Sequence, residues 1–183
     1  MTESPAIEDA DTDTALRKVG RFFAANISDV SPRAMGTAGL RAALDPTNVA
    51  LQIRAGVPTV AAINSHAPLA IANGVATELG DPAAAMRLMA ETKLLEHLAV
   101  AAAARGRGYA RALVEAAERR HRADGVSAWF GFVDERERDA LGLYEHLGFC
   151  AATAAQLPGP ANILGRAHIS RSGTWFFKEL NPR

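Results

Sequence analysis

The segment from residue 95 to residue 125 reads LEHLAVAAAARGRGYARALVEAAERRHRADG, and it decides the fold class. An apolar run from Leu94 to Val100 predicts a strand, and apolar residues recur at helical spacing from Tyr109 to Asp124. A loop with two glycines and two arginines separates these two parts. The order of strand, glycine loop and helix is typical of a mixed α/β fold.

The loop itself predicts a phosphate site. Because glycine has no side chain, a ligand can approach the backbone closely and the chain can adopt positive φ. The N–H groups of the first helical turn, together with the helix dipole, attract an anion. Arg105 and Arg107 add charge suited to phosphate. We therefore expect a phosphate-bearing ligand at the hexapeptide Arg105-Gly106-Arg107-Gly108-Tyr109-Ala110.

A single continuous helix from Leu94 to Asp124 is the simplest alternative, since alanine is the strongest helix former. Two interior glycines argue against it, because each costs about 1 kcal/mol relative to alanine in a helix. The apolar spacing also changes across the loop. The sequence therefore favours a strand, a loop and a helix.

Two known phosphate loops can be compared with these residues. A P-loop needs Gly-Lys-Ser/Thr, whereas Gly108 is followed by Tyr109. A dinucleotide fingerprint has a third glycine where this chain has Arg111, although Asp134 follows the next predicted strand as that fingerprint expects. A dinucleotide-binding oxidoreductase therefore stays open as an alternative.

The chain resembles the GCN5-related N-acetyltransferase (GNAT) family between about Leu94 and Phe149. The family's cofactor loop follows a strand ending in Leu-Ala-Val and reads Arg/Gln-x-x-Gly-x-Gly/Ala, which is matched by Leu98-Ala99-Val100 and then by Arg105, Gly108 and Ala110. A second family motif, A-x-x-L-Y-x-x-L-G-F, is similar to the segment from Ala140 to Phe149.

This resemblance implies a mixed, mostly antiparallel central sheet with helices on both faces. It implies acetyl-CoA as co-substrate, direct attack by a primary amine of a small molecule or protein, and Tyr144 as general acid. Glu137 stands where many family members have asparagine. The cofactor-binding residues implied are Leu98, Ala99, Val100, Arg105, Gly106, Arg107, Gly108, Tyr109 and Ala110.

A general base is needed because an unperturbed lysine amine has a pKa of about 10.4. Glu96 and His97 lie in the predicted strand, and alternation places only one of them on the substrate side. We favour Glu96, acting directly or through water. The alternative is that Glu96 is a surface carboxylate or a salt-bridge partner.

Composition excludes a strong general attraction to polyanions. Lysine and arginine number 20, as do aspartate and glutamate, so the formal net charge is zero. Six arginines against two glutamates between Arg105 and Arg122 leave a non-catalytic RNA- or protein-binding module as a further alternative. We expect neither nucleic acid nor membrane as a partner.

The single cysteine, Cys150, excludes an intrachain disulfide and favours a reducing, cytoplasmic location. We expect Cys150 to be a buried apolar residue. The histidines have no metal-ligand spacing, so no metal is expected. The final strand suggests a homodimer, in which it would pair across subunits.

The acidic residues 1–13 are expected to be a disordered tail, and residues 14–183 a single acetyltransferase-like domain. The predicted helices are 14–27, 31–44, 81–92, 109–124 and 139–147. The predicted strands are 49–55, 59–65, 94–100, 126–133, 149–155 and 174–180.

Overall fold

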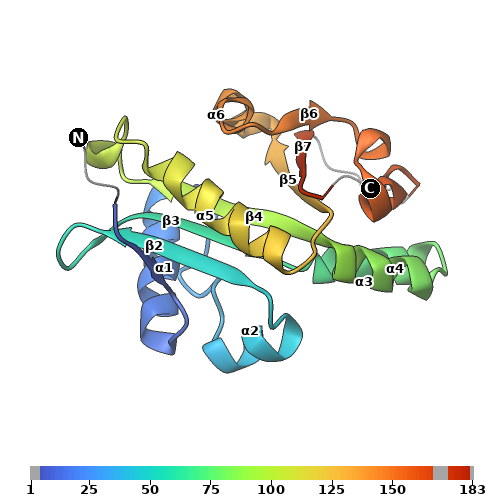
Figure 1. Ribbon diagram of the computed structural model, residues 1–183, viewed down its shortest axis with the longest axis horizontal. Coiled ribbons are helices and arrows are strands. Elements are labelled where there is room, and N and C mark those ends of the chain that lie inside the picture. The colour runs from blue at the N-terminus through green and yellow to red at the C-terminus, as the bar shows by residue number, and fades with distance from the viewer. Residues whose placement is uncertain (1–4, 167–172, 182–183) are drawn as a thin grey trace. The chain divides into compact units, whose positions relative to one another are not determined.

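The computed structural model describes residues 5–166 and 173–181 of the chain (Figure 1). The helices are α1 (Asp13–Asn26), α2 (Ala38–Leu44), α3 (Leu69–Glu78), α4 (Pro82–Glu91), α5 (Tyr109–Ala123) and α6 (Ala140–His146). The strands are β1 (Ile7–Asp9), β2 (Val49–Arg54), β3 (Thr59–His66), β4 (Thr92–Val100), β5 (Ala128–Asp134), β6 (Cys150–Ala152) and β7 (Gly173–Glu179). Short 3₁₀ turns are η1 (Ala102–Ala104), η2 (Glu135–Glu137), η3 (Ala154–Gln156) and η4 (Gly159–Gly165).

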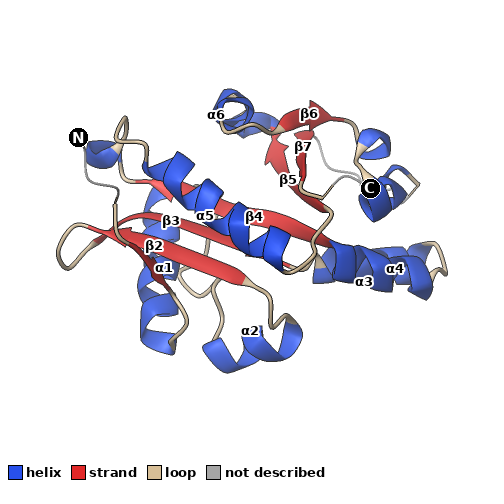
Figure 2. Cartoon of the chain, in the orientation of Figure 1, coloured by secondary structure: helices blue, strands red, loops and turns tan. Residues whose placement is uncertain are grey.

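The described strands form a seven-stranded sheet in the order β1-β2-β3-β4-β5-β7-β6 (Figure 2). The β4 and β5 pair is parallel, as expected for two strands joined by the crossover helix α5. The pairs β1–β2, β2–β3, β5–β7 and β6–β7 are antiparallel. The predicted class, a mixed α/β fold with a mostly antiparallel sheet, is confirmed.

The chain divides into two compact units. The first contains residues 1–65 and 96–120, and the second contains residues 66–95 and 121–183. Strand β4 contributes its first half to the second unit and its second half to the first. That residues 14–183 form a single domain stays a prediction.

In the first unit, α1 contributes several buried apolar residues to the core. The Thr12 side chain accepts a hydrogen bond from the Ala15 N–H, which caps the helix at its start. Leu16, Val19 and Phe23 are almost completely buried, and they belong to a cluster that includes alanines of β2, β3 and β4. Helix α5 lies in front of these strands and α1 behind them (Figure 1).

The N-terminal segment departs from the prediction of a disordered tail. Strand β1 pairs antiparallel with β2, with Ile7 opposite Ile53. The Arg120 guanidinium on α5 pairs with the Asp9 carboxylate through two hydrogen bonds, one of them 2.9 Å long. The prediction of disorder is therefore wrong for Ile7–Asp9, because an open strand edge and an arginine are available as partners.

Two helices differ from the prediction. The predicted helix 31–44 begins only at Ala38, because Gly36 has a φ of +63° and Thr37 caps the helix by accepting from the Leu40 N–H. Helix α3 was not predicted. Its many alanines and its glycine give little amphipathic pattern, and Pro68 at its start makes no side-chain capping bond.

In the second unit, β5 and β7 form an antiparallel ribbon with two different faces. Phe130 and Trp175 pack with α3, α4 and η4 in one cluster. Trp129, on the other face, contacts Phe149 edge to face with ring centroids 5.2 Å apart. This alternation follows from the period of two in a strand.

Two further expectations are wrong. Cys150 is exposed rather than buried, because β6 is the last strand of the sheet. Strand β7 lies between β5 and β6 rather than at an edge of the sheet, so it is not the free edge that was expected to pair across subunits. A homodimer itself stays a prediction. No helix within residues 5–166 and 173–181 is long and apolar enough to cross a membrane.

Candidate active site

The predicted phosphate loop is an open turn of the first unit. Gly106 has a φ of +75° and Gly108 has a φ of +76°. Residues that carry a side chain rarely adopt such positive values of φ. A Cβ added at either glycine would meet no atom within 4 Å. The residues from Arg105 to Gly108 are exposed. The backbone of the loop is therefore accessible to a ligand.

Helix α5 starts directly after this loop. The Ala112 N–H donates to Gly108 O at 3.0 Å, so the hydrogen bonds of the helix begin there. The N–H groups of Tyr109 and Ala110 have no acceptor within the helix itself. They lie at the positive end of the helix dipole, which favours an anion at this place.

The four alanines before the loop do not continue a helix. Ala102–Ala104 form only the short turn η1, after which the chain is extended at Arg105. The Arg105 Nε donates to Val100 O at 3.4 Å, which links the loop to the end of β4. The predicted order of strand, loop and helix is confirmed, and the continuous helix is excluded.

The end of β4 offers backbone rather than side chains. Leu98 and Ala99 are buried in the core and Val100 is half-buried. Their side chains stabilise the fold, so a ligand would meet mainly the peptide groups of this strand end.

The two candidate bases of β4 differ in their surroundings. The His97 ring is half-buried and stacks on Phe23 of α1, with ring centroids 5.0 Å apart. Glu96 is exposed. His97 therefore packs against Phe23, whereas Glu96 lies at the surface.

Tyr144 lies on α6 in the second unit. Its ring stacks on Phe176 of β7 with centroids 3.9 Å apart and planes 13° apart, and Phe149 contacts it edge to face. Burial raises the pKa of Tyr144 to about 12, and repulsion from the Glu137 carboxylate adds to the rise. The phenol is therefore protonated at neutral pH. Tyr144 and the loop at Arg105–Ala110 belong to different units.

Gly131 of β5 supports this aromatic stack. It lies opposite Phe176 in the β5–β7 ribbon, and a Cβ added at Gly131 would be 2.2 Å from the Phe176 ring. The ring therefore lies directly over the glycine, and Tyr144 lies on the ring. Sequence reasoning missed this role, although a glycine inside an apolar strand often marks such a close approach.

Lys178 of β7 holds the C-terminal end of α6. Its Nζ donates to Leu147 O at 2.9 Å and lies 5.0 Å from the centre of the Phe149 ring. Gly148 has a φ of +85°, and a Cβ added there would be 3.3 Å from that Nζ. A cation at a helix C-terminus is favourable, so Lys178 stabilises the helix that carries Tyr144.

Asp134, the acidic residue on which the dinucleotide-binding alternative depends, has a local structural role. The Asp134 carboxylate accepts from the Arg136 N–H at 3.0 Å and pairs with the Arg136 Nε at 3.5 Å, so it caps η2. Among the residues that the structure describes, no group of three or more metal-ligating side chains is present.

The comparison with protein families supports the resemblance seen in the sequence. Residues 70–151 match the family model described as "Acetyltransferase (GNAT) domain". This range contains both motifs on which the resemblance rested. No protein with a curated description matches the chain significantly. The resemblance to the GNAT family is confirmed.

Solved structures share the whole fold. The ribosomal-protein-S18-alanine N-acetyltransferase from Escherichia coli has a TM-score of 0.60 and 16% identity, over 98% of this chain and 96% of that chain. The protein yncA from Salmonella typhimurium, solved with its cofactor acetyl-CoA, has a TM-score of 0.65 and 12% identity, over 99% of this chain and 96% of that chain.

A third structure is N-acetylglutamate synthase from Neisseria gonorrhoeae, complexed with coenzyme A and N-acetyl-glutamate. Its TM-score is 0.62 and its identity 13%, over 100% of this chain but only 36% of that chain. At these identities the likeness shows the fold, and the chain has the fold of GNAT acetyltransferases.

Proposed function

We propose that this protein is an N-acetyltransferase that moves the acetyl group of acetyl-CoA to a primary amine. The observation that carries the proposal is the open loop at Arg105–Ala110, where two glycines with positive φ precede the first turn of α5. Peptide N–H groups and two guanidinium groups there would hold the pyrophosphate of the cofactor.

The end of β4 would complete the cofactor site. The peptide groups of Leu98, Ala99 and Val100 are suited to bind an extended cofactor arm, because the Leu98 and Ala99 side chains are buried in the core and Val100 is half-buried. An N–H near Val100 would stabilise the oxyanion that forms when the amine attacks the thioester carbonyl. Glu96, which is exposed, would accept the proton of the amine.

Tyr144 would donate toward the departing thiolate. A thiol has a pKa of about 8.5, so complete proton transfer from a phenol with a pKa of about 12 costs about 5 kcal/mol. In this environment the phenol contributes mainly as a hydrogen-bond donor to the developing thiolate. Because the Tyr144 phenol already carries its proton at neutral pH, it can donate this hydrogen bond without first gaining or losing a proton.

The acceptor is an amine of a small molecule or of a protein. The family resemblance implies an acceptor site formed by residues 26–44 and 157–173, of which 167–172 lie outside the described residues. We further propose a cytoplasmic location, because the single cysteine suits a reducing compartment.

Calorimetry with acetyl-CoA tests the proposal directly. We expect wild type to bind, and Gly108→Glu to lose binding at least tenfold, because the new carboxylate would repel the pyrophosphate and strain the turn. Gly56→Glu is the matched control, since Gly56 also has positive φ (+66°) and open space around it but lies in the β2–β3 turn. Equal affinity of wild type and Gly108→Glu would disprove the cofactor site.

A further inference from the structure

The C-terminal end of α6 is a cap of the Schellman type, and Tyr144 is part of it. The Phe149 N–H donates to Tyr144 O at 3.0 Å, and the Gly148 N–H donates to Glu145 O at 2.9 Å. Gly148 has the positive φ, +85°, that this motif places directly after the C-cap. The apolar contact that accompanies the motif is the edge-to-face packing of Phe149 on Tyr144. The cap therefore holds both the backbone and the ring of Tyr144.

Lys178 of β7 contacts this cap in two ways. Its Nζ donates to the carbonyl oxygen of the C-cap residue, Leu147, which is 31 positions earlier in the chain. The carbonyls at a helix end have no N–H partner within the helix, so a donor from another element is needed there. The same Nζ lies 5.0 Å from the centre of the Phe149 ring, whose face attracts a cation. One ammonium group thus holds the backbone and the aromatic part of the cap together.

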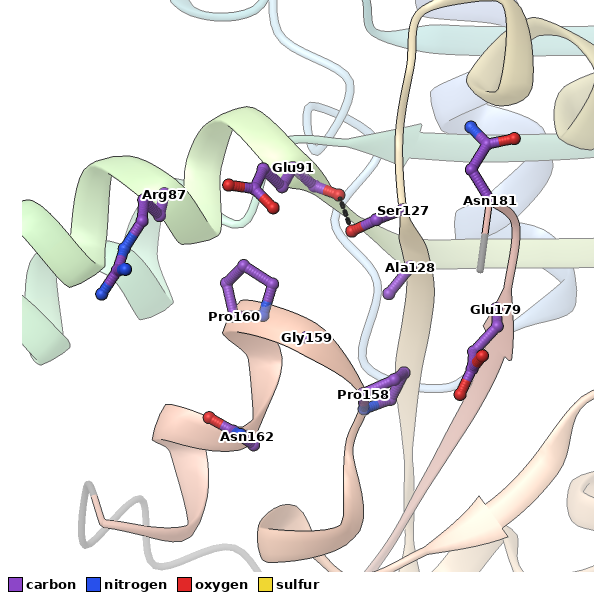
Figure 3. A pocket seen from close by; sticks show the side chains of 10 residues that line it. All are labelled: Arg87, Glu91, Ser127, Ala128, Pro158, Gly159, Pro160, Asn162, Glu179 and Asn181. Carbon is purple, nitrogen blue, oxygen red and sulfur yellow. Dashed lines mark hydrogen bonds between the residues drawn. The ribbon is translucent and has the colours of Figure 1, made fainter. Parts of the chain in front are cut away.

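The β7 strand separates this cap from the other face of the β5–β7 ribbon. Figure 3 shows Glu179 beside a hollow of about 470 Å³, which residues of α4, β5, η4 and β7 line. Neighbouring residues of a strand point to opposite faces, so Lys178 points away from the hollow. The Lys178 side chain therefore belongs to the face on which Tyr144 packs.

Two phenylalanines transmit the position of the cap to the phenol. Tyr144 stacks on Phe176 with ring centroids 3.9 Å apart, and Phe149 packs perpendicular to Phe176 with centroids 5.3 Å apart. Phe149 and Phe176 are both almost completely buried. Because such an interior is closely packed, a shift of Phe149 displaces the rings that it contacts. The place of the Tyr144 ring therefore depends on the ring that Lys178 holds.

We propose that Lys178 is a positioning residue for the Tyr144 phenol, and that the site requires its positive charge rather than its bulk. This inference rests on the proposed function, in which the phenol donates to the departing thiolate. Loss of the ammonium group removes a donor from Leu147 O and a cation from the Phe149 ring, so the cap and the Tyr144 ring move. The loop at Arg105–Ala110 belongs to the other unit and keeps its structure. The expected kinetic result is a lower kcat with an unchanged KM for acetyl-CoA.

Fluorine NMR measures the position of the phenol independently of activity. The chain has two tyrosines, so a Tyr109→Phe protein labelled with fluorotyrosine gives the signal of Tyr144 alone. In this protein Lys178→Met should move the signal toward its position in the unfolded chain, because the ring leaves its stack. Lys178→Arg should keep the signal near its original position, since a charged donor remains.

Controls separate the role of Lys178 from a general loss of structure. Lys18→Met, at an exposed lysine of α1 in the first unit, should leave the Tyr144 signal unchanged. If Lys178→Met does not fold, Lys178→Gln takes its place, because its uncharged amide ends one bond short of the Lys178 Nζ and should displace the ring in the same way. A Tyr144 signal that stays in place in the folded, uncharged variant would overturn the proposal.

Steady-state kinetics test whether Lys178 acts through the phenol. Lys178→Met should lower kcat at least tenfold with KM for acetyl-CoA within about twofold, and Lys178→Arg should restore most of kcat. In a Tyr144→Phe protein the same Lys178→Met change should have almost no further effect on kcat. Equal losses with and without the phenol would also overturn the proposal. If the wild type transfers no acetyl group, the proposed function fails, and the NMR signal still decides whether Lys178 positions Tyr144.

Discussion

At the scale of single residues, Gly108 and Tyr144 owe their properties to different levels of structure. The φ of +76° at Gly108 is a local requirement of the turn, and glycine meets it wherever such a turn occurs. The raised pKa of Tyr144 comes from burial and from the Glu137 carboxylate. The neighbouring sequence explains why a glycine stands at position 108. It does not predict the raised pKa of Tyr144.

The pKa of Tyr144 predicts a loss of stability at high pH. The folded-state pKa of about 12 is above the ordinary value of 10, so the folded protein retains the proton more strongly. The resulting stability is fully present below pH 10 and is lost as the pH rises toward 12, by up to about 2–3 kcal/mol. Urea unfolding of wild type and Tyr144→Phe at pH 9 and pH 11.5 measures this effect. The variant should lose less stability than wild type over that interval, and equal losses would contradict the assignment.

At the scale of elements, the β5–β7 ribbon determines where α6 places Tyr144. Phe176 occupies the space above Gly131, and the Tyr144 ring packs on Phe176. Lys178, two residues further along β7, holds the end of α6 through Leu147 O. The position of the phenol therefore depends on residues outside the family motif.

Gly131→Ala tests this dependence. The added methyl group would overlap the Phe176 ring, and we expect a loss of about 1–3 kcal/mol of stability. Displacement of Tyr144 should lower kcat for acetyl transfer at least tenfold, with little change in KM for acetyl-CoA. Gly142→Ala on α6 is the control, because its added Cβ would meet nothing within 4 Å. A normal kcat in a folded Gly131→Ala protein would show that the stack does not position the phenol.

The predictability of the elements depended on their local patterns. The predicted helix from Tyr109 corresponds to α5, and Asp81-Pro82 marks the start of α4 as expected. Helix α3 was missed because its small residues carry no amphipathic pattern, and its burial comes from packing against α4 and η4. Short segments such as Ile7–Asp9 acquire their structure from a partner strand, which a local pattern cannot reveal.

At the scale of the whole molecule, the chain folds as two compact units that share strand β4. Within the first unit, the pair of Asp9 and Arg120 joins residues 111 positions apart in the sequence. The Arg120 guanidinium lowers the pKa of Asp9 through its hydrogen bonds, although both side chains are nearly half exposed.

A double-mutant cycle with Asp9→Ala and Arg120→Ala should measure a small coupling. Because water and salt screen an exposed pair, we expect about 0.2–1 kcal/mol in urea unfolding at pH 7. The coupling should be lost as the pH falls through the lowered pKa of Asp9, since the protonated carboxyl no longer attracts Arg120. A coupling well above this range, or one that is independent of pH, would contradict the assignment.

The sequence by itself determined the mixed α/β class, the family resemblance and the order of strand, glycine loop and helix. These properties are local, because the strand, the glycine turn and the helix start follow from residues close together in the chain. Only the tertiary structure decided the stack of Gly131, Phe176 and Tyr144, the anchoring of Ile7–Asp9, and the hollow between α4, η4 and the β5–β7 ribbon. The physical reason is that each of them depends on contacts between residues far apart in sequence, and those contacts exist only after the chain has folded.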